Sequence, residues 1–244
     1  MDKSNKNILV IIPAYNEERN IGEVIRSIHT VVPSGKVLVI DDCSTDDTGD
    51  IAVDSGALVV RHQINLGYGS SLETGYLYAL KNGYDLVVQM DGDGQHLAEE
   101  IPALLDMESI DEADIIIGSR YAGGDGGYRP TFARRAGHRF FSVVYTLMTG
   151  LKINDPTSGF QCLNRNALDL YTRSRFPDDY PDVDVLLIAH FSGLRIREIP
   201  VVMNDRTDGV SMHSGLKPLY YIVKMLLSVF MAVLNHRRWI RRVS

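Results

Sequence analysis

The sequence predicts an α/β fold in which helices cover a mostly parallel central sheet. Short apolar runs of strand length alternate along the chain with segments of helical periodicity, and this alternation is typical of parallel sheets. The runs are rich in β-branched and aliphatic residues, as expected for strands that are buried on both faces. They are Ile8–Pro13, Val37–Asp41, Leu58–His62, Leu86–Met90 and Ile115–Ser119.

The helices of the first half are indicated by periodicity and by residues that favour helix ends. Asn20–Val31 has apolar residues at helical spacing and is predicted to be an amphipathic helix that Asn20 caps. Ser44 is expected to cap the next helix. Because glycine favours the backbone conformation that ends a helix, we expect helix ends at Gly56 and Gly83.

The second half is less regular. The glycine-rich run at 123–127 is expected to form a mobile loop, and Phe132–Thr149 a helix that Gly150 ends. A strand is predicted near Ile196–Val202, followed by a strongly apolar helix from Pro218. We therefore divide the chain into an α/β domain, residues 1–212, and a C-terminal helical appendage, residues 213–244.

Length and composition fit one globular domain. The chain has 244 residues, of which 45% are hydrophobic and 23% are charged, a balance typical of folded proteins. Cys43 and Cys162 are too few for a disulfide framework or a zinc cluster, and they favour a reducing compartment. Residues 1–7 lack the apolar core of a signal peptide, so a cytoplasmic location is expected.

The charge is distributed unevenly. Residues 1–208 carry 19 basic and 31 acidic side chains, a net charge of −12, whereas the remainder carries six basic side chains and no acidic one. An acidic body argues against nucleic acid as a partner, and the basic tail favours contact with an anionic surface. A solvated helical tail is the alternative.

Two carboxylates directly follow the fourth predicted strand, in the run Asp91-Gly92-Asp93-Gly94-Gln95-His96. Carboxylates two residues apart at a strand end can point to the same side. Together with the Gln95 carbonyl they offer hard oxygen ligands, which suit Mg²⁺ or Mn²⁺. An acidic turn without a metal is the structural alternative.

Polar motifs also follow the first two strands, in the runs Pro13-Ala14-Tyr15-Asn16-Glu17 and Asp41-Asp42-Cys43-Ser44. Ligands of open parallel sheets bind outside the carboxyl ends of the strands, so the three motifs are expected to share one crevice. An aspartate there can accept a hydrogen bond from a nucleotide base, and Tyr15 can stack on the ring. Alternatively, Asp42 and Ser44 cap a turn and a helix. The chain has neither the glycine fingerprint of dinucleotide-binding folds nor a P-loop.

The order of these motifs resembles glycosyltransferase family 2 enzymes of GT-A fold, and most closely the dolichyl- and polyprenyl-phosphate sugar synthases. The resemblance covers roughly residues 8–211 and includes three further motifs. These are Gly118-Ser119-Arg120-Tyr121, the run from Asp155 to Phe160, and the run from Arg206 to Ser211.

The resemblance implies roles for individual residues. Asp91, Asp93 and Gln95 match the metal site of the group. The nucleotide-sugar pocket is matched by Pro13, Ala14, Tyr15, Glu17, Asp41, Asp42, Asp91 and Gly92. Arginines for donor or acceptor phosphates are matched by Arg120, Arg134 and Arg206, with Arg135 and Ser211 beside them. Met212 departs from the group, in which a lysine commonly follows the serine.

The chemistry of such a transfer fits these residues. Negative charge develops on the leaving diphosphate, and a divalent ion held by Asp93 together with Arg120 and Arg134 can stabilise that charge. A surface ion pair is the alternative reading of each arginine.

The acceptor decides whether a base is needed. A lipid phosphate, with a second pKa of about 6, is already ionised near neutral pH, whereas a sugar hydroxyl needs a positioned carboxylate. Asp182 and Asp184 lie where base-using relatives carry an acidic residue, and capping of a helix is their structural alternative.

We therefore expect an inverting glycosyltransferase that moves a hexose from UDP-sugar or GDP-mannose to a polyprenyl phosphate at the cytoplasmic face of the membrane. A transferase that acts on a hydroxyl in a surface polysaccharide is the runner-up. A silent subunit and a nucleotidyltransferase fit less well. The apolar stretch of the tail is shorter than the roughly 20 residues that a helix needs to span a bilayer. The tail is therefore expected to lie on the membrane surface or to contact a small membrane protein or a second copy of the chain. A core helix is its alternative.

Overall fold

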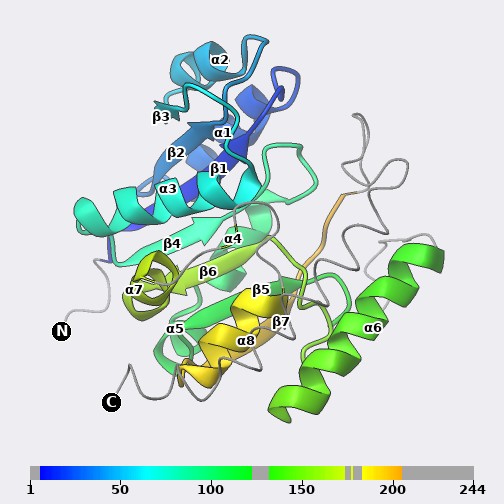
Figure 1. The fold of residues 1–244 in the computed structure, drawn as a ribbon. Coiled ribbons are helices and arrows are strands. Elements are labelled where there is room, and N and C mark those ends of the chain that lie inside the picture. Colours follow the sequence, from blue (N-terminus) through cyan, green and yellow to red (C-terminus); the bar gives the residue numbers. More distant parts are fainter. Residues whose placement is uncertain (1–5, 123–131, 174–176, 178–182, 205–244) are drawn as a thin grey trace.

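The protein is built on a seven-stranded sheet in the order β3-β2-β1-β4-β6-β5-β7 (Figure 1). The structure, a computed structural model, describes residues 6–122, 132–173, 177 and 183–204. β6 is antiparallel to both of its neighbours, and all other paired strands are parallel. The strands are β1 (Ile8–Ala14), β2 (Lys36–Asp41), β3 (Leu58–Arg61), β4 (Leu86–Gln89), β5 (Ile115–Ser119), β6 (Gln161–Asn164) and β7 (Ile196–Pro200).

Helices cover both faces of the sheet, and each face has its own apolar core. One core contains residues of α3, α6, α7 and α8, and the other contains residues of α1, α2, α4 and α5. On the first face, α6 and α8 lie side by side near β7 (Figure 1). The helices are α1 (Ile21–Val31), α2 (Thr48–Asp54), α3 (Tyr68–Lys81), the 3₁₀ turn Ala98–Glu100, α4 (Ile101–Leu104), α5 (Met107–Glu112), α6 (Phe132–Thr149), α7 (Arg165–Arg173) and α8 (Val183–Phe191).

The predicted α/β fold with a mostly parallel sheet is confirmed. All six predicted strands are present, and glycines with positive φ follow the helices at the expected positions 56, 83 and 150. One predicted helix cap is confirmed in position and the other is wrong. Helix α1 begins directly after Asn20, as predicted, but the Asn20 side chain makes no cap hydrogen bond and instead donates to Glu17. Ser44 does not cap α2, which begins at Thr48 after Asp47. The Ser44 hydroxyl instead accepts a hydrogen bond from the backbone N–H of Asn16.

Several expectations concern residues outside the described part of the chain. These are the loop at 123–127, the apolar helix from Pro218 and therefore the appendage at 213–244. Among the residues that the structure does describe, no helix is both long and apolar enough to cross a membrane.

Asp114 fixes how the antiparallel part of the sheet is assembled. Its buried carboxylate accepts hydrogen bonds from the side chains of Asn164 and Asn166 at 2.9 and 3.0 Å. It also accepts from the backbone N–H of Arg195 at 2.9 Å. The residue before β5 thus holds the end of β6 and the start of β7. Burial opposes its ionisation, but these hydrogen bonds outweigh burial and hold the pKa of Asp114 below its ordinary value.

The substitution Asp114→Asn tests this junction. We expect a loss of about 1–3 kcal/mol in the free energy of unfolding at neutral pH, because buried donors lose a charged acceptor. A lowered native pKa stabilises the fold above the unfolded pKa and is lost as pH falls through the native value. The difference from the wild type should therefore shrink in acid, as measured by urea unfolding between pH 7 and pH 3. Asp85→Asn, at a more exposed carboxylate that accepts from Asn7, is the control. A pH-independent difference would contradict the assignment.

Candidate active site

The loops that follow β1 and β2 are tied together by hydrogen bonds. The backbone N–H of Asn16 donates to Ser44 Oγ at 3.0 Å, and the Asn16 side chain accepts from the N–H of Thr45 at 2.8 Å. The N–H of Glu17 donates to Thr48 Oγ1 at 2.8 Å. Asn16 adopts a positive φ of 57°, which asparagine tolerates better than most residues. The two strand ends therefore form one continuous rim.

The predicted nucleotide residues lie along this rim. Pro13 and Ala14 are buried at the end of β1, whereas the Tyr15 side chain is exposed and available for stacking. Asp41 is buried and accepts from the N–H of Ser44 at 2.9 Å, with Arg61 Nε 3.8 Å away. The structure brings these residues together at the carboxyl ends of the strands, as predicted.

Asp42 holds the loop between β3 and α3. One carboxylate oxygen accepts from the backbone N–H of Leu66 at 2.8 Å and contacts His62 Nδ1 at 2.7 Å. The other oxygen accepts from the N–H of Gly67 at 2.8 Å. Since Asp42 is buried, these bonds satisfy a carboxylate that would be costly to leave unpaired. Asp42 thus has a structural role, as the alternative interpretation of the sequence proposed, although in the loop before α3. Its contact with a nucleotide base stays a prediction.

Asp91 is oriented by Tyr68 of α3 and by His96 of its own turn. Its Oδ1 accepts from the Tyr68 hydroxyl at 2.9 Å, and its backbone N–H donates to His96 Nδ1 at 2.9 Å. His96 Nε2 lies 3.8 Å from Asp91 Oδ2, and its ring stacks on Phe160. A Cβ atom added at Gly159 would lie 2.9 Å from the Tyr68 hydroxyl and 3.6 Å from the Asp91 carboxylate. The close approach therefore requires glycine at that position.

The rest of the acidic turn packs against the rim. Gly92 is buried, and a Cβ atom there would lie 3.3 Å from Ile12 and 3.8 Å from Glu17. Asp93 Oδ1 accepts from the N–H of Gln95 at 3.1 Å. The ends of β1, β2 and β4 therefore converge, which confirms the geometric expectation from the three motifs.

The donor set of this turn fits a hard divalent ion. Asp91 and Asp93 provide half-buried carboxylates on one turn, and Gln95 is close by. Within the described ranges, no group of three or more histidine, cysteine, aspartate or glutamate side chains is placed to hold a metal. Oxygen donors of this kind suit Mg²⁺ and Mn²⁺, both of which usually keep water or substrate phosphates in their shell.

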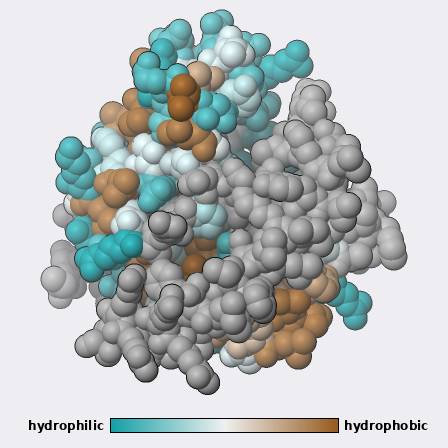
Figure 2. Space-filling model, in the orientation of Figure 1, coloured by the Kyte–Doolittle hydropathy of each residue, from teal (hydrophilic) through white to brown (hydrophobic). Residues whose placement is uncertain are grey.

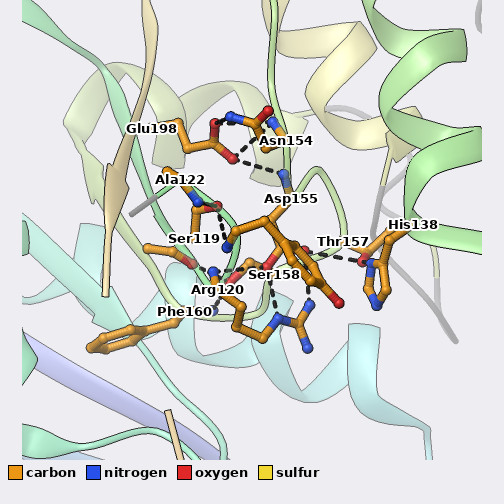
Figure 3. A network of polar contacts seen from close by, with 12 residues as sticks. Ser119, Arg120, Ala122, His138, Asn154, Asp155, Thr157, Ser158, Phe160 and Glu198 are labelled. Atoms are coloured by element: carbon orange, nitrogen blue, oxygen red, sulfur yellow. Dashed lines mark hydrogen bonds and ion pairs between the residues drawn. The ribbon is translucent and has the colours of Figure 1, made fainter. Parts of the chain in front are cut away.

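One segment, residues 155–160, lies between this turn and Arg120. Figure 3 shows the contacts that it makes around Arg120. At its start, Asp155 is fully buried and binds Arg120 through two hydrogen bonds, from Nε at 2.7 Å and from a terminal nitrogen at 2.8 Å. At its end, Gly159 lies beside Asp91, where an added Cβ atom would be 3.6 Å from the carboxylate, and Phe160 stacks on His96. The segment thus binds Arg120 directly and lies against the residues of the acidic turn.

The segment is anchored at both flanks. Glu198 of β7 accepts hydrogen bonds from the backbone N–H groups of Asn154 and Asp155 at 2.9 and 2.7 Å (Figure 3). Ser158 donates to the carbonyl of Gly118 at 2.6 Å. His138 of α6 contacts Thr157 at 2.8 Å and lies 3.6 Å from Asp155. Tyr68, His138 and Glu198 belong to no local motif of the sequence, so their roles could not be predicted from it.

Asp184 opens helix α8 but is buried. The Asp184 Oδ1 atom accepts a hydrogen bond from the N–H of Val185 at 2.9 Å, and Asp184 is only 5% exposed. Burial raises the pKa of Tyr171, and the charges of Tyr145 and Asp184 raise it further. The Asp184 carboxylate therefore lies close to the buried side chains of Tyr145 and Tyr171, which we call the tyrosine core. Asp182, Arg206 and Ser211 lie outside the described residues, as do the side chains of Arg134 and Arg135 on α6.

Comparison with known proteins identifies the family. Residues 9–171 match the model of glycosyl transferase family 2. The chain is 31% identical over 222 residues to polyprenol monophosphomannose synthase of Mycolicibacterium smegmatis, covering 87% of this chain and 83% of the relative. It is 32% identical over 216 residues to undecaprenyl-phosphate mannosyltransferase of Micrococcus luteus, covering 85% and 88%.

Solved structures share the fold. Glucosyl-3-phosphoglycerate synthase from Mycobacterium tuberculosis, in complex with phosphoglyceric acid, superposes with a TM-score of 0.69 at 24% identity, covering 96% of this chain and 81% of that one. The same enzyme with Mn²⁺ and UDP-glucose gives 0.69 at 22% identity, covering 94% and 79%. With this GT-A-like sheet and the family match over more than half of its length, the chain belongs to glycosyl transferase family 2.

Proposed function

We propose that this protein transfers a hexose from a nucleotide-diphosphate sugar to a polyprenyl phosphate, with inversion at the anomeric carbon. The observation that carries the proposal is the 155–160 segment, which binds Arg120 through Asp155 and packs against His96 of the acidic turn through Phe160. The two relatives named above, by their names, act on polyprenyl phosphates. The donor is a UDP-sugar or GDP-mannose.

The donor is proposed to bind along the rim formed by β1, β2 and β4. Tyr15 is exposed for stacking on the base, and Asp41, Asp42 and Glu17 line the same edge. Asp91, Asp93 and Gln95 would hold Mg²⁺ or Mn²⁺, which when bound neutralises charge on the diphosphate. Tyr68 and His96 form hydrogen bonds with Asp91 and fix its orientation. Residues that hydrogen-bond to a metal ligand in this way commonly orient the ligand and affect its affinity for the metal.

Arg120 is proposed to donate hydrogen bonds to a phosphate oxygen. During transfer, the bond between the anomeric carbon and the donor phosphate oxygen breaks, and its electron pair leaves on that oxygen. A new bond forms between the anomeric carbon and an oxygen of the lipid phosphate. The planar guanidinium is suited to such oxygens, and Asp155 fixes its plane in advance by two hydrogen bonds. Arg134, Arg135, Arg206 and Ser211 are proposed to bind the acceptor phosphate.

The placement of Asp184 argues against this one of the two candidate residues as a general base. A general base must come within hydrogen-bond reach of the proton that it removes, but Asp184 is buried beside a tyrosine core. An ionised lipid phosphate needs no such base. We further propose that the protein works at the cytoplasmic face of a membrane as a peripheral protein.

The substitution Asp93→Asn tests the metal assignment. Loss of one charged ligand should lower turnover at saturating Mn²⁺ by at least about 100-fold, since metal stabilisation of the leaving group is worth several kcal/mol. Glu99→Gln, at an exposed acid nearby in sequence, is the control and should keep full turnover. Circular dichroism should report an unchanged fold for both. Near wild-type turnover of the Asp93 variant would refute the assignment.

The substitution Arg120→Lys tests the fixed guanidinium. Lysine keeps the charge but loses the two-pronged geometry, so we expect kcat to fall about tenfold or more with little change in melting temperature. The matched control is Arg195→Lys, whose arginine contacts Asp114 at the other end of β5 and should retain its kcat. Equal losses in the two variants would show a general stability effect.

The substitution Asp184→Asn tests whether this residue acts as a general base. With a short-chain, water-soluble prenyl phosphate as acceptor, we expect kcat within about threefold of the wild type, because an ionised nucleophile needs no base. Loss of a required general base would cost about 10²- to 10⁴-fold. A loss of that size in the variant, with its fold intact, would favour a hydroxyl acceptor instead.

A further inference from the structure

Helix α3 brings a tyrosine to the acidic turn. Tyr68 is the first residue of α3, and its hydroxyl donates a hydrogen bond to Asp91 Oδ1 at 2.9 Å. The hydroxyl lies at the far end of a long side chain, so a small shift or rotation of the helix would take it out of hydrogen-bond range. The contact with Asp91 therefore depends on how accurately the first turns of α3 are placed.

The start of α3 is held by the buried carboxylate of Asp42. The backbone N–H groups of Leu66 and Gly67, the two residues directly before Tyr68, donate to the two oxygens of this carboxylate at 2.8 Å each. Gly67 has a positive φ of 96°, a conformation that favours glycine and lets the chain turn into the helix. Asp42, directly after β2, thus fixes the point at which α3 begins.

His62 attaches the second turn of α3 to the same carboxylate. Its Nε2 lies 3.0 Å from Thr74 Oγ1, and its Nδ1 lies 2.7 Å from Asp42 Oδ1. Because an ionised carboxylate only accepts hydrogen bonds, the Nδ1 atom donates to Asp42. Gly67 and Thr74 are seven residues apart, which is about 10 Å along a helix. Two attachments at this separation restrict both the tilt and the rotation of α3.

His62 and Asp42 are withdrawn from a polar surface. Figure 2 shows a largely hydrophilic surface at the top of the molecule, where α2 and β3 lie in Figure 1. The side chains of His62 and Asp42 are nevertheless only 8% and 5% exposed. Burial of such groups is costly unless they are hydrogen-bonded. Contacts at both nitrogens of His62 and both oxygens of Asp42 compensate for this cost and hold the pair in one geometry.

We propose that His62 is a positioning residue for Asp91, and that it acts through Asp42, Thr74 and the placement of Tyr68 on α3. The inference rests on the proposed role of Asp91 as a metal ligand. Removing a residue that orients a metal ligand commonly lowers metal affinity by about 10- to 100-fold. His62 thereby links the end of β3 to the turn after β4, although these two strands are not neighbours in the sheet.

The test is the affinity of the full-length chain for Mn²⁺ alone, measured by electron paramagnetic resonance. His62→Asn keeps a donor for Asp42 but is too short to reach Thr74, and Thr74→Val removes only the hydroxyl. Each should weaken Mn²⁺ binding about tenfold. Thr74→Ser restores the hydroxyl and should recover the wild-type affinity. Asn82→Ala removes a side-chain hydrogen bond at the other end of α3 and is the matched control, with unchanged affinity.

A double-variant cycle tests the route through Tyr68. Tyr68→Phe should itself weaken Mn²⁺ binding about tenfold, because it removes the hydroxyl that contacts Asp91. In that background, Thr74→Val should cause no further loss, since residues that act through one another are not additive. Additive losses would show that His62 and Thr74 do not act through this tyrosine, and would overturn the inference.

Turnover separates a positioning role from a general loss of structure. At low Mn²⁺ the His62→Asn and Thr74→Val variants should be slower than the wild type, and raising Mn²⁺ should restore their kcat. Wild-type Mn²⁺ affinity in both variants, with circular dichroism showing an intact fold, would overturn the inference. Weaker binding of UDP or GDP in metal-free buffer, with unchanged Mn²⁺ affinity, would assign the pair to the nucleotide pocket and also overturn it.

The proposed function can fail separately. If the wild type binds Mn²⁺ but transfers no sugar to a polyprenyl phosphate, the proposed acceptor is wrong, and the Mn²⁺ affinities of the variants still decide the role of His62. If the wild type binds no Mn²⁺, the metal assignment and the inference fall together.

Discussion

The site depends on the burial of one carboxylate, that of Asp155. A buried carboxylate is stable only when it is paired and its remaining acceptor sites are satisfied. Arg120 supplies two hydrogen bonds to it, and a backbone N–H supplies a third. Asp155 has no exposed surface, so this pairing fixes where the guanidinium lies and in which plane. The end of β5 and the 155–160 segment are consequently one rigid unit.

The antiparallel strand β6 makes this unit possible. A parallel strand at that position would begin at the opposite edge of the sheet, away from the carboxyl ends where ligands bind. Because β6 runs the other way, the residues just before it lie at the ligand edge and bring Gly159 against Asp91. Asp114 secures the same strand at its far end through Asn164. Two buried carboxylates thus fix β6 at both ends.

The sequence was sufficient for most strands and for the acidic turn, which depend on neighbouring residues. The apolar runs identified six strands, and the turn at Asp91 was recognised because its carboxylates directly follow a strand. It was insufficient for β6, whose four residues include polar side chains and form no apolar run, and for α8, which is apolar on most sides and shows no helical stripe. It also missed Glu198, since its contact with Asn154 joins residues 44 positions apart.

The pairing of Arg120 also limits what this arginine contributes to the proposed reaction. With Asp155 fully buried beside it, the pair carries no net charge. The proposed contact of Arg120 with a phosphate would therefore act through directed hydrogen bonds rather than through a net positive potential. The donor diphosphate and the lipid phosphate together bring several negative charges into one site, and their mutual repulsion must be offset. Other cations must therefore supply the net positive charge. The ion proposed at Asp91 and Asp93 is one source, and the arginines proposed for the acceptor are the other. In this proposal, Arg120 provides hydrogen bonds of fixed direction, and the metal ion and the other arginines provide the positive charge. A transferase can therefore hold one arginine in a neutral pair and still bind two anionic phosphate groups next to each other.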